Sequence, residues 1–299
     1  VRSRGLGDVY KRQDNAVIMA AGVSSRFAPL SYETPKALIN VNGEVLLERQ
    51  IRQLKDAGIE EIILVVGYMK EQFYYLQDKL GVRIVDNNDY KTRNNHSSIY
   101  AVREYLRNTY ICSADNYFTK NPFERVVDDA YYAALYADGE TKEWCMETGD
   151  DGYVNRVQIG GKGAWYMLGH AFWNENFSRR FVSILEAEYQ LPETAGLLWE
   201  AIYMKHLDEL KLKVRHYDPD FIFEFDSLDE LRTFDKSYIG DTRSAILKGI
   251  AQEMGCSEAQ ISQITVIKDP LGVEAAGFEF MCGAERYEYY YERKVWRKV

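Results

Sequence analysis

The sequence predicts an α/β fold, a three-layer α/β/α arrangement whose sheet is mixed but mainly parallel. Short apolar segments alternate with amphipathic ones from about residue 14 to residue 115. Residues 62–66 are continuously apolar, as expected of a parallel strand covered on both faces. After about residue 128, strand-like segments follow one another closely, which indicates antiparallel additions to the same sheet.

The first half of the chain follows the order β-α-β-α-β-α-β. Gly58 ends the first expected helix, because glycine readily adopts the left-handed conformation that closes a helix. In open sheets of this kind ligands bind beyond the carboxyl ends of the strands, which draws attention to the loops after Ala20, Val66 and Ala114. The expected strands are residues 16–20, 62–66, 82–85 and 110–114, and the expected helices are residues 45–57, 70–80 and 97–106.

Three parts are expected along the chain. Residues 1–13 are basic and lack apolar periodicity, which predicts an appended or disordered leader. Residues 14–241 form the main domain, and residues 242–299 form a small α+β appendage that serves packing or a dimer contact. The later expected strands are 130–136, 153–159, 164–171, 212–216, 221–225, 264–267, 278–282 and 287–291, and the later helices are 177–189, 194–206, 227–235 and 244–255.

Composition excludes several classes of protein. The 299 residues include 46 acidic and 37 basic ones, so the formal net charge is −9 and a general grip on nucleic acid is not expected. No apolar run approaches the roughly 18–20 residues of a membrane span, so no membrane insertion is expected. There is no signal-peptide pattern, and the expected location is the cytoplasm. The four histidines have no metal-ligand spacing.

The most specific motif follows the first strand. It reads MAAGVSSRF over residues 19–27, and TPKAL follows over residues 34–38. Small residues after a buried strand let backbone N–H groups approach a phosphate, and nearby cations bind its charge. A glycine turn with two surface cations is the simpler alternative, but the whole string favours a phosphate loop. Its candidate nucleotide-binding residues are Ala20, Ala21, Gly22, Ser24, Ser25, Arg26 and Lys36.

This string resembles the signature of the nucleotidyltransferases that activate sugar phosphates and phospho-alcohols. Within that superfamily the chain is similar to the bacterial CTP:phosphocholine cytidylyltransferases. The resemblance implies a Rossmann-like, GT-A-like fold and transfer of CMP from CTP to phosphocholine, giving CDP-choline and pyrophosphate. It spans about residues 15–234 and includes segments 32–38, 66–73, 94–100, 114–117, 143–144 and 223–227.

The resemblance also implies roles for charged residues. Lys36, Arg26 and Asp115 are the implied catalytic residues, with Lys36 stabilising charge on the phosphates. Asp115 and Asp226 are the implied ligands of Mg²⁺. Asp115 ends an expected strand, where such an ion belongs. Asp226 is distant in sequence, and the cap of the helix that follows it is an alternative role.

Recognition of the two substrates needs other side chains. Asn94 and Asn95 fit two roles equally, reading the base or ribose or starting the next helix, and Tyr68 fits a nucleotide contact or a helix start. A quaternary ammonium is held by aromatic faces and carboxylates. Trp144 ranks first among the aromatic residues because it follows Glu143 in a matching segment. The acceptor-binding candidates are Tyr117, Trp144, Trp199, Tyr203 and Glu224, with ordinary core packing as the alternative for the aromatic ones.

Two other functions remain open from sequence. The acceptor can be a sugar 1-phosphate or phosphoethanolamine, or the chain can be a non-catalytic protein that binds nucleotides. The intact Arg26, Lys36, Asp115 and Asp226 favour the enzyme. The expected partners are therefore CTP and phosphocholine. The oligomeric state is open, with a homodimer among the options.

Overall fold

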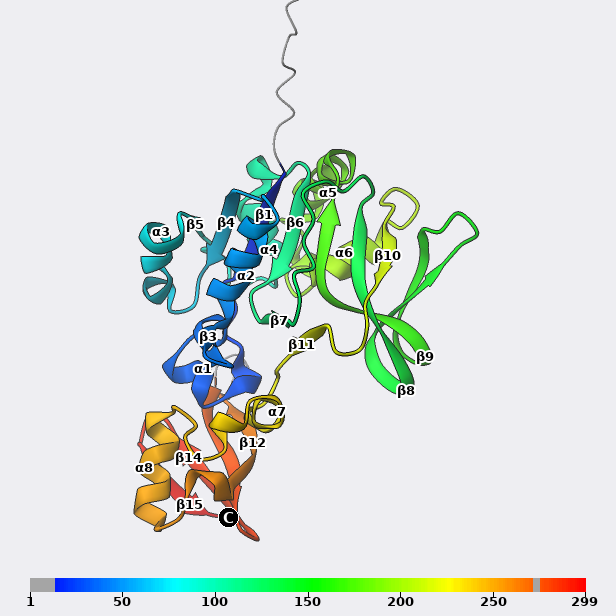
Figure 1. The fold of residues 1–299 in the computed structure, drawn as a ribbon. Helices are drawn as coiled ribbons and strands as arrows, with labels where there is room; N and C mark the ends of the chain where they lie inside the picture. The colour runs from blue at the N-terminus through cyan, green and yellow to red at the C-terminus, as the bar shows by residue number, and fades with distance from the viewer. Residues whose placement is uncertain (1–13, 271–274) are drawn as a thin grey trace, which may run out of the picture.

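The computed structural model describes residues 14–270 and 275–299, so the predicted leader lies outside the described residues. A seven-stranded sheet of order β10-β8-β9-β6-β1-β4-β5 forms the centre of the main domain (Figure 1). At its middle, β1 (Asn15–Ala20) pairs in parallel with β4 (Glu61–Val66) and β6 (Thr109–Ser113). The parallel strand β5 (Arg83–Asp86) follows β4 at one edge. The predicted mixed, mainly parallel α/β fold is confirmed.

The other half of the sheet contains two long antiparallel strands, β8 (Tyr131–Thr148) and β9 (Val154–Trp173). The separate strands expected at 153–159 and 164–171 were wrong, because β9 runs through both. Gly160 and Gly163 interrupt the apolar pattern and adopt positive φ values of 79° and 60° within the strand. β9 is antiparallel to β6, and β10 (Lys213–His216) lies parallel to β8.

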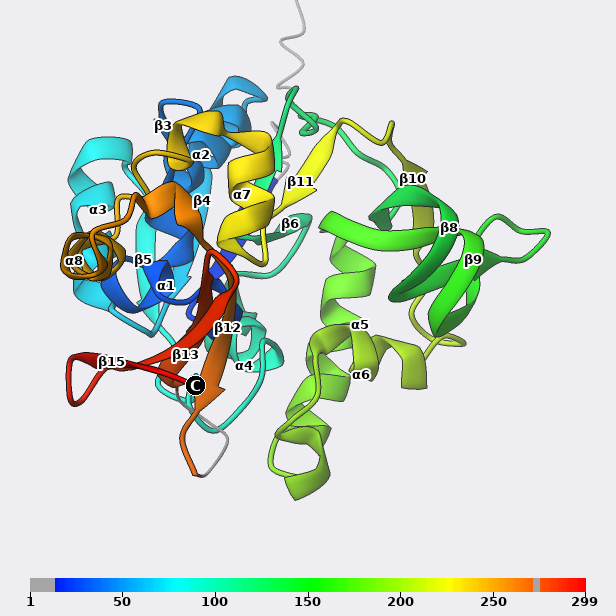
Figure 2. The same ribbon diagram turned by 90° about the horizontal axis from the view of Figure 1, so that it is seen from below.

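Helices cover both faces of the sheet and complete the three layers (Figures 1 and 2). On one face, α2 (Leu46–Asp56) and α3 (Tyr75–Leu80) pack their apolar residues against the strands. On the other, α4 (His96–Ala101), α5 (Glu175–Glu188) and α6 (Trp199–Lys205) enclose the larger apolar cluster.

Three expected helices are shorter than the sequence predicts. Residues 70–80 and 97–106 each divide into an α-helix and a 3₁₀ helix, the latter at Lys70–Phe73 and Arg103–Tyr105. The helix expected at 194–206 begins only at Trp199, because Pro192 starts a separate 3₁₀ turn and Gly196 follows it. Helical periodicity does not reveal such breaks. The remaining short elements of this region are η1 (Ser25–Phe27), α1 (Leu30–Glu33), η2 (Lys36–Leu38), β2 (Asn40–Val41) and β3 (Glu44–Val45).

Polar side chains of α2 hold the chain on both sides of Asp115. Gln50 Nε2 donates to the carbonyl oxygen of Ser113 at 3.0 Å, and Gln53 Nε2 donates to that of Phe118 at 3.2 Å. Both glutamines are buried. The segment that carries Asp115 is therefore tied to a helix of the main domain rather than left as a free loop.

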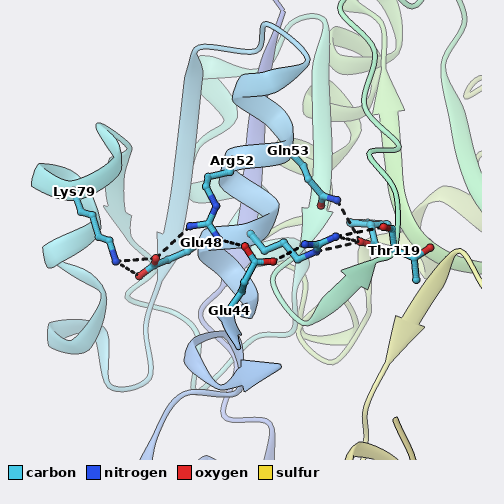
Figure 3. Close-up of polar contacts among 8 residues, drawn as sticks. Glu44, Glu48, Arg52, Gln53, Lys79 and Thr119 are labelled. Atoms are coloured by element: carbon cyan, nitrogen blue, oxygen red, sulfur yellow. Dashed lines mark hydrogen bonds and ion pairs between the residues drawn. The ribbon is translucent and has the colours of Figure 1, made fainter. Parts of the chain in front are cut away.

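The outer side of α2 joins it to its neighbours through ion pairs (Figure 3). The buried carboxylate of Glu48 accepts hydrogen bonds from Lys79 of α3 at 2.8 and 2.9 Å. Arg52 bonds Glu44 at 2.8 Å. These contacts fix α2 relative to α3 and β3.

A two-stranded ladder joins distant parts of the chain. β7 (Asn116–Phe118) pairs antiparallel with β11 (Ile222–Glu224), and Asn116 lies opposite Glu224. After β11, Ser227 is the N-cap of α7 (Leu228–Phe234). Its side chain accepts a hydrogen bond from the backbone N–H of Glu230.

The C-terminal region contains α8 (Ala245–Met254) and an antiparallel sheet, as the sequence predicts, with one unexpected strand (Figure 2). The division at residue 242 stays a prediction, because the third apolar cluster includes residues from both sides of it. No helix of the described residues is long and apolar enough to cross a membrane. The strands are β12 (Ile261–Lys268), β13 (Ala275–Cys282), β14 (Glu285–Tyr290) and the unexpected β15 (Val295–Lys298).

Candidate active site

A cavity of about 230 Å³ opens at the carboxyl ends of β1, β5 and β6. This is the position where open α/β sheets bind ligands. The loop after β1 forms one wall, and the segment before α4 forms another. Sequence-predicted residues that line it are Ala20, Ala21, Gly22, Ser24, Lys36, Asn94, Asn95 and Asp115, whereas Ser25, Arg26 and Tyr68 are not among the described lining residues.

The loops after β1 and β4 pack closely against each other. The backbone N–H of Tyr68 donates to the carbonyl oxygen of Ala21 at 3.1 Å. A Cβ at Gly67 would lie 2.7 Å from the ring of Tyr90 and 3.0 Å from the Ala21 oxygen, so this close approach requires glycine. Ser24 has a φ of 50°, which is the left-handed conformation that a non-glycine residue rarely adopts. The loop therefore has a specific, tightly supported shape.

Lys36 is the centre of the charged part of the site. Only 5% of the residue is exposed, and its Nζ donates to Asp115 Oδ2 at 2.8 Å. The same nitrogen lies 3.5 Å from Asp226 Oδ1 and 3.9 Å from Glu224 Oε1. Burial alone lowers the pKa of Lys36, but the surrounding carboxylates outweigh burial and raise it above the ordinary value. Lys36 is therefore a buried, charged ammonium group.

The β7–β11 ladder explains how Asp226 reaches Asp115. Glu224 pairs opposite Asn116, the residue after Asp115, and Asp226 follows two positions later. Ser227 caps α7, so the capping alternative for Asp226 is wrong. Asp226 instead accepts a hydrogen bond from Arg26 Nη1 at 2.5 Å. The structure thus brings together the charged residues that the sequence singled out.

The donor set of this cluster fits Mg²⁺. Asp115 and Asp226 present hard carboxylate oxygens to one point, and Mg²⁺ prefers one or two carboxylates completed by phosphate oxygens and water. Across residues 14–270 and 275–299, no group of three or more His, Cys, Asp or Glu side chains forms a full metal site by itself. Burial and the neighbouring Asp115 raise the pKa of Glu224, which Lys36 opposes.

Several lining residues were missed from sequence. Asn87 is buried after β5, where its Nδ2 donates to Ser97 Oγ at 2.8 Å and to Ser98 Oγ at 3.1 Å. The guanidinium of Arg93 lies over the ring of Tyr189, 4.3 Å from its centroid. Its buried Nη1 has no hydrogen-bond partner among the described residues. In the sequence, Asn87 and Arg93 stand out only because they precede Asn94 and Asn95. This does not distinguish them from other loop residues.

Asn95 connects the cavity to a half-buried carboxyl group on α6. Its Oδ1 accepts from the backbone N–H of Trp199 at 2.7 Å, and its Nδ2 donates to Glu200 Oε2 at 3.3 Å. Tyr132 Oη donates to the other Glu200 oxygen at 3.0 Å. Burial raises the pKa of Glu200 to about 7. Of these three residues only Asn95 was predicted from sequence. Glu200 and Tyr132 were missed because neither belongs to a recognisable motif.

The predicted acceptor-binding aromatic residues lie in different environments. Trp199 and Tyr203 are 1% and 0% exposed, because the apolar side of α6 packs into the core of the main domain. Tyr117 is buried against Phe234, with its ring under the Arg49 guanidinium. Trp144 is half-buried at the margin of the cluster that contains Tyr132 and Trp199. A direct contact of any of them with an acceptor stays a prediction, and Trp144 is the most accessible of the four.

Comparison with known proteins identifies the family. Residues 16–155 match the model of the MobA-like NTP transferase domain. The choline-phosphate cytidylyltransferase of Streptococcus pneumoniae is 38% identical over 221 residues, which cover 74% of this chain and 96% of that protein. The chain belongs to the bacterial cytidylyltransferase family that includes this enzyme. It is therefore a nucleotidyltransferase, as the sequence predicts.

A further relative and a solved structure complete the comparison of this cytidylyltransferase. A 2-aminoethylphosphonate cytidylyltransferase of Lancefieldella rimae is 36% identical over 77% of this chain and 95% of its own length. The solved structure of the CTP:phosphocholine cytidylyltransferase from Streptococcus pneumoniae superposes with a TM-score of 0.72 at 37% identity. It covers 75% of this chain and 99% of that one.

The raised pKa of Glu200 predicts a pH-dependent effect on stability. Because the folded-state pKa of about 7 exceeds that of an unfolded glutamate, ionisation destabilises the fold as pH rises from about 4.5 to 7. Glu200→Gln should therefore gain stability relative to wild type over this window, on the order of 3 kcal/mol at pH 8, because each pKa unit is worth about 1.4 kcal/mol. Urea denaturation at pH 5 and pH 8 measures it. A difference that does not change with pH contradicts the interpretation.

Proposed function

We propose that this cytidylyltransferase transfers CMP from CTP to phosphocholine and releases CDP-choline and pyrophosphate. The observation that carries the proposal is the convergence of Lys36, Asp115 and Asp226 at the edge of the cavity formed by the small-residue loop. This is the charge arrangement that phosphate transfer needs, since the task is to position and neutralise polyanions. The choice of CTP and phosphocholine is supported by the relatives.

The cavity offers suitable groups for the nucleotide. A Cβ at Gly22 would meet no described atom within 4 Å, so internal packing does not require this glycine. A glycine at position 22 would instead let the backbone approach the triphosphate of CTP closely. Arg93 adds a buried N–H group without a described partner, which suits an acceptor atom of the base or ribose. Asn94 and Asn95 line the same wall.

The chemical step follows from these charges. A phosphate oxygen of phosphocholine attacks the α-phosphorus of CTP, forming one P–O bond as the bond to the β-phosphate breaks and pyrophosphate leaves. The second pKa of a phosphate monoester is about 6, so the attacking group is already largely ionised at neutral pH and no general base is needed. Lys36 stabilises the charge that develops on the transferred group. Arg26, which donates a hydrogen bond to Asp226, is a second cation that can bind phosphate oxygens.

Asp115 and Asp226 are proposed to hold Mg²⁺. When bound, the ion supplies charge neutralisation for the phosphates. Lys36 and Arg26 make the ion pairs with these carboxylates. With CTP bound, both cations would pair with phosphate oxygens, and Asp115 and Asp226 would then hold Mg²⁺.

The acceptor headgroup is assigned to the side of the site that carries Glu200, whose carboxyl group accepts hydrogen bonds from Asn95 and Tyr132. Burial raises the pKa of the Tyr132 hydroxyl, and the charges of Glu200 and Glu224 raise it further. A cationic headgroup next to Glu200 favours its ionised form and so offsets the cost of burial. The half-buried Trp144 would add an aromatic face, which a quaternary ammonium prefers.

A primary ammonium is the specific alternative, because a 2-aminoethylphosphonate cytidylyltransferase is nearly as similar to this chain. Such a group donates hydrogen bonds and is well served by carboxylates alone, whereas trimethylammonium relies on aromatic faces and electrostatics. A comparison of kcat/KM for acceptors with a primary ammonium and with a trimethylammonium group therefore distinguishes the two.

The expected reaction is Mg²⁺-dependent pyrophosphate release from CTP with phosphocholine as acceptor. The assay compares phosphocholine, phosphoethanolamine, 2-aminoethylphosphonate and glucose 1-phosphate, with EDTA as the metal control. The highest kcat/KM is expected with phosphocholine. A preference for either primary amine would replace the acceptor, and no release with any acceptor while CTP still binds would favour the non-catalytic alternative.

Substitution of Trp144 tests the aromatic face. Trp144→Ala should raise KM for phosphocholine about tenfold and leave KM for CTP unchanged, because a cation–π contact of a desolvated ammonium is worth roughly 1–2 kcal/mol. Trp144→Phe should restore most of the affinity. Trp296→Ala, which removes a tryptophan of the C-terminal region, is the matched control. Equal changes in both KM values would assign Trp144 to packing.

A further inference from the structure

The described residues of the C-terminal unit, 242–270 and 275–299, pack on the segment that contains the nucleotide loop (Figures 1 and 2). Phe27 and Leu30 of that segment share an apolar cluster with Phe278 and Phe280 of β13. β12 also lies against η1, the 3₁₀ helix that has Arg26 at its centre. The C-terminal unit thus contacts the same loop that lines the cavity, through other residues of that loop.

A carboxylate of the loop caps the helix of the C-terminal unit. Glu33, the last residue of α1, accepts hydrogen bonds from the backbone N–H groups of Ala245 at 2.8 Å and Ile246 at 3.2 Å. It also accepts one from Ser244 Oγ. An acid at a helix N-terminus is stabilised by the exposed N–H groups and the helix dipole. Residue 33 lies three positions before Lys36, so this cap holds the end of the loop.

A stacked pair of tyrosines makes the second connection. The rings of Tyr32 and Tyr291 are parallel within 1°, and their centroids are 3.8 Å apart. Tyr291 is only 6% exposed, and its hydroxyl has no hydrogen-bond partner among the described residues. Burial raises the pKa of Tyr291, and the charges of Tyr32 and Tyr68 raise it further. Tyr68 is itself bonded to Ala21.

We propose that residues 242–299 position the nucleotide loop for CTP, acting through the Tyr32–Tyr291 stack and the Glu33 cap of α8. This inference rests on the proposed function of the loop. Residues 21–36 contain only a 3₁₀ turn and a single turn of α-helix, so few internal hydrogen bonds hold them. Ordering such a loop costs conformational entropy when the ligand binds. A unit that orders it beforehand removes that cost from CTP binding.

The solved relative matches part of this chain: the superposition covers 99% of that chain and 75% of this one, so a quarter of this chain has no counterpart there. In our proposal the positioning unit adds to the nucleotide affinity of the transferase fold. Its loss is expected to affect CTP far more than the acceptor, because Glu200 and Tyr132 lie on other elements.

The test compares Tyr32→Ala with Tyr32→Phe in the full chain. Tyr32 is 45% exposed, so its replacement should leave the fold intact, which a thermal melt verifies. Tyr32→Ala removes the stack and should raise KM for CTP about fivefold with KM for phosphocholine unchanged, whereas Tyr32→Phe keeps the stack and should behave as wild type. Glu33→Ala breaks the other contact and should show the same selective rise. Trp296→Ala removes contacts with Glu253 and Tyr287 inside the C-terminal unit, keeps both the stack and the cap, and should have no effect.

The outcomes separate this inference from the proposed function. A wild-type chain that releases no pyrophosphate contradicts the function itself. An active wild type with an unchanged KM for CTP in both Tyr32→Ala and Glu33→Ala overturns the inference alone. Equal rises in both KM values also overturn it, because they show general loosening. A selective rise in KM for CTP, absent in Tyr32→Phe and Trp296→Ala, supports it.

Discussion

The contact of the Lys36 ammonium with Asp115, Asp226 and Glu224 is the interaction on which the rest of the site depends. The carboxylates come from two distant segments, joined by the β7–β11 ladder, and like charges this close repel one another even where they are partly exposed. A buried cation between them makes the arrangement stable. The elements around it serve this contact: α2 holds the chain on both sides of Asp115, and the loop after β1 leads to Lys36.

The same electrostatics divide the site into two sides. Lys36 makes the cavity wall attractive to an anionic triphosphate, although the chain as a whole carries a net charge of −9. On the other side, Glu200 accepts hydrogen bonds from the uncharged side chains of Asn95 and Tyr132, so a neighbouring cation would stabilise its ionised form. Phosphocholine carries both a phosphate and an ammonium group, so it can span the two sides. The charges are thus arranged locally, where net charge gives no guidance.

Much of the fold and of the charged cluster was predictable, for physical reasons that individual residues illustrate. Parallel strands such as β4 are apolar throughout, and a string of small residues between a buried strand and Arg26 is typical of a loop that binds phosphate. Asp226 required the family resemblance, because only the ladder brings it to Asp115. Arg93, Tyr132 and Glu200 were missed because their significance arises from burial and missing or shared partners, which spacing does not encode. The glycines of β9 concealed its continuity for a similar reason.

The turnover of Lys36→Met tests the central claim most directly. Pyrophosphate release from saturating CTP and phosphocholine should fall at least about a hundredfold in kcat, because a preorganised charge at the transferred phosphate is lost. Lys36→Arg, which keeps the charge, should retain more activity, and Lys213→Met, which removes a partly exposed lysine paired with Asp129, should match wild type. A folded Lys36→Met protein with kcat within about threefold of wild type would contradict the account.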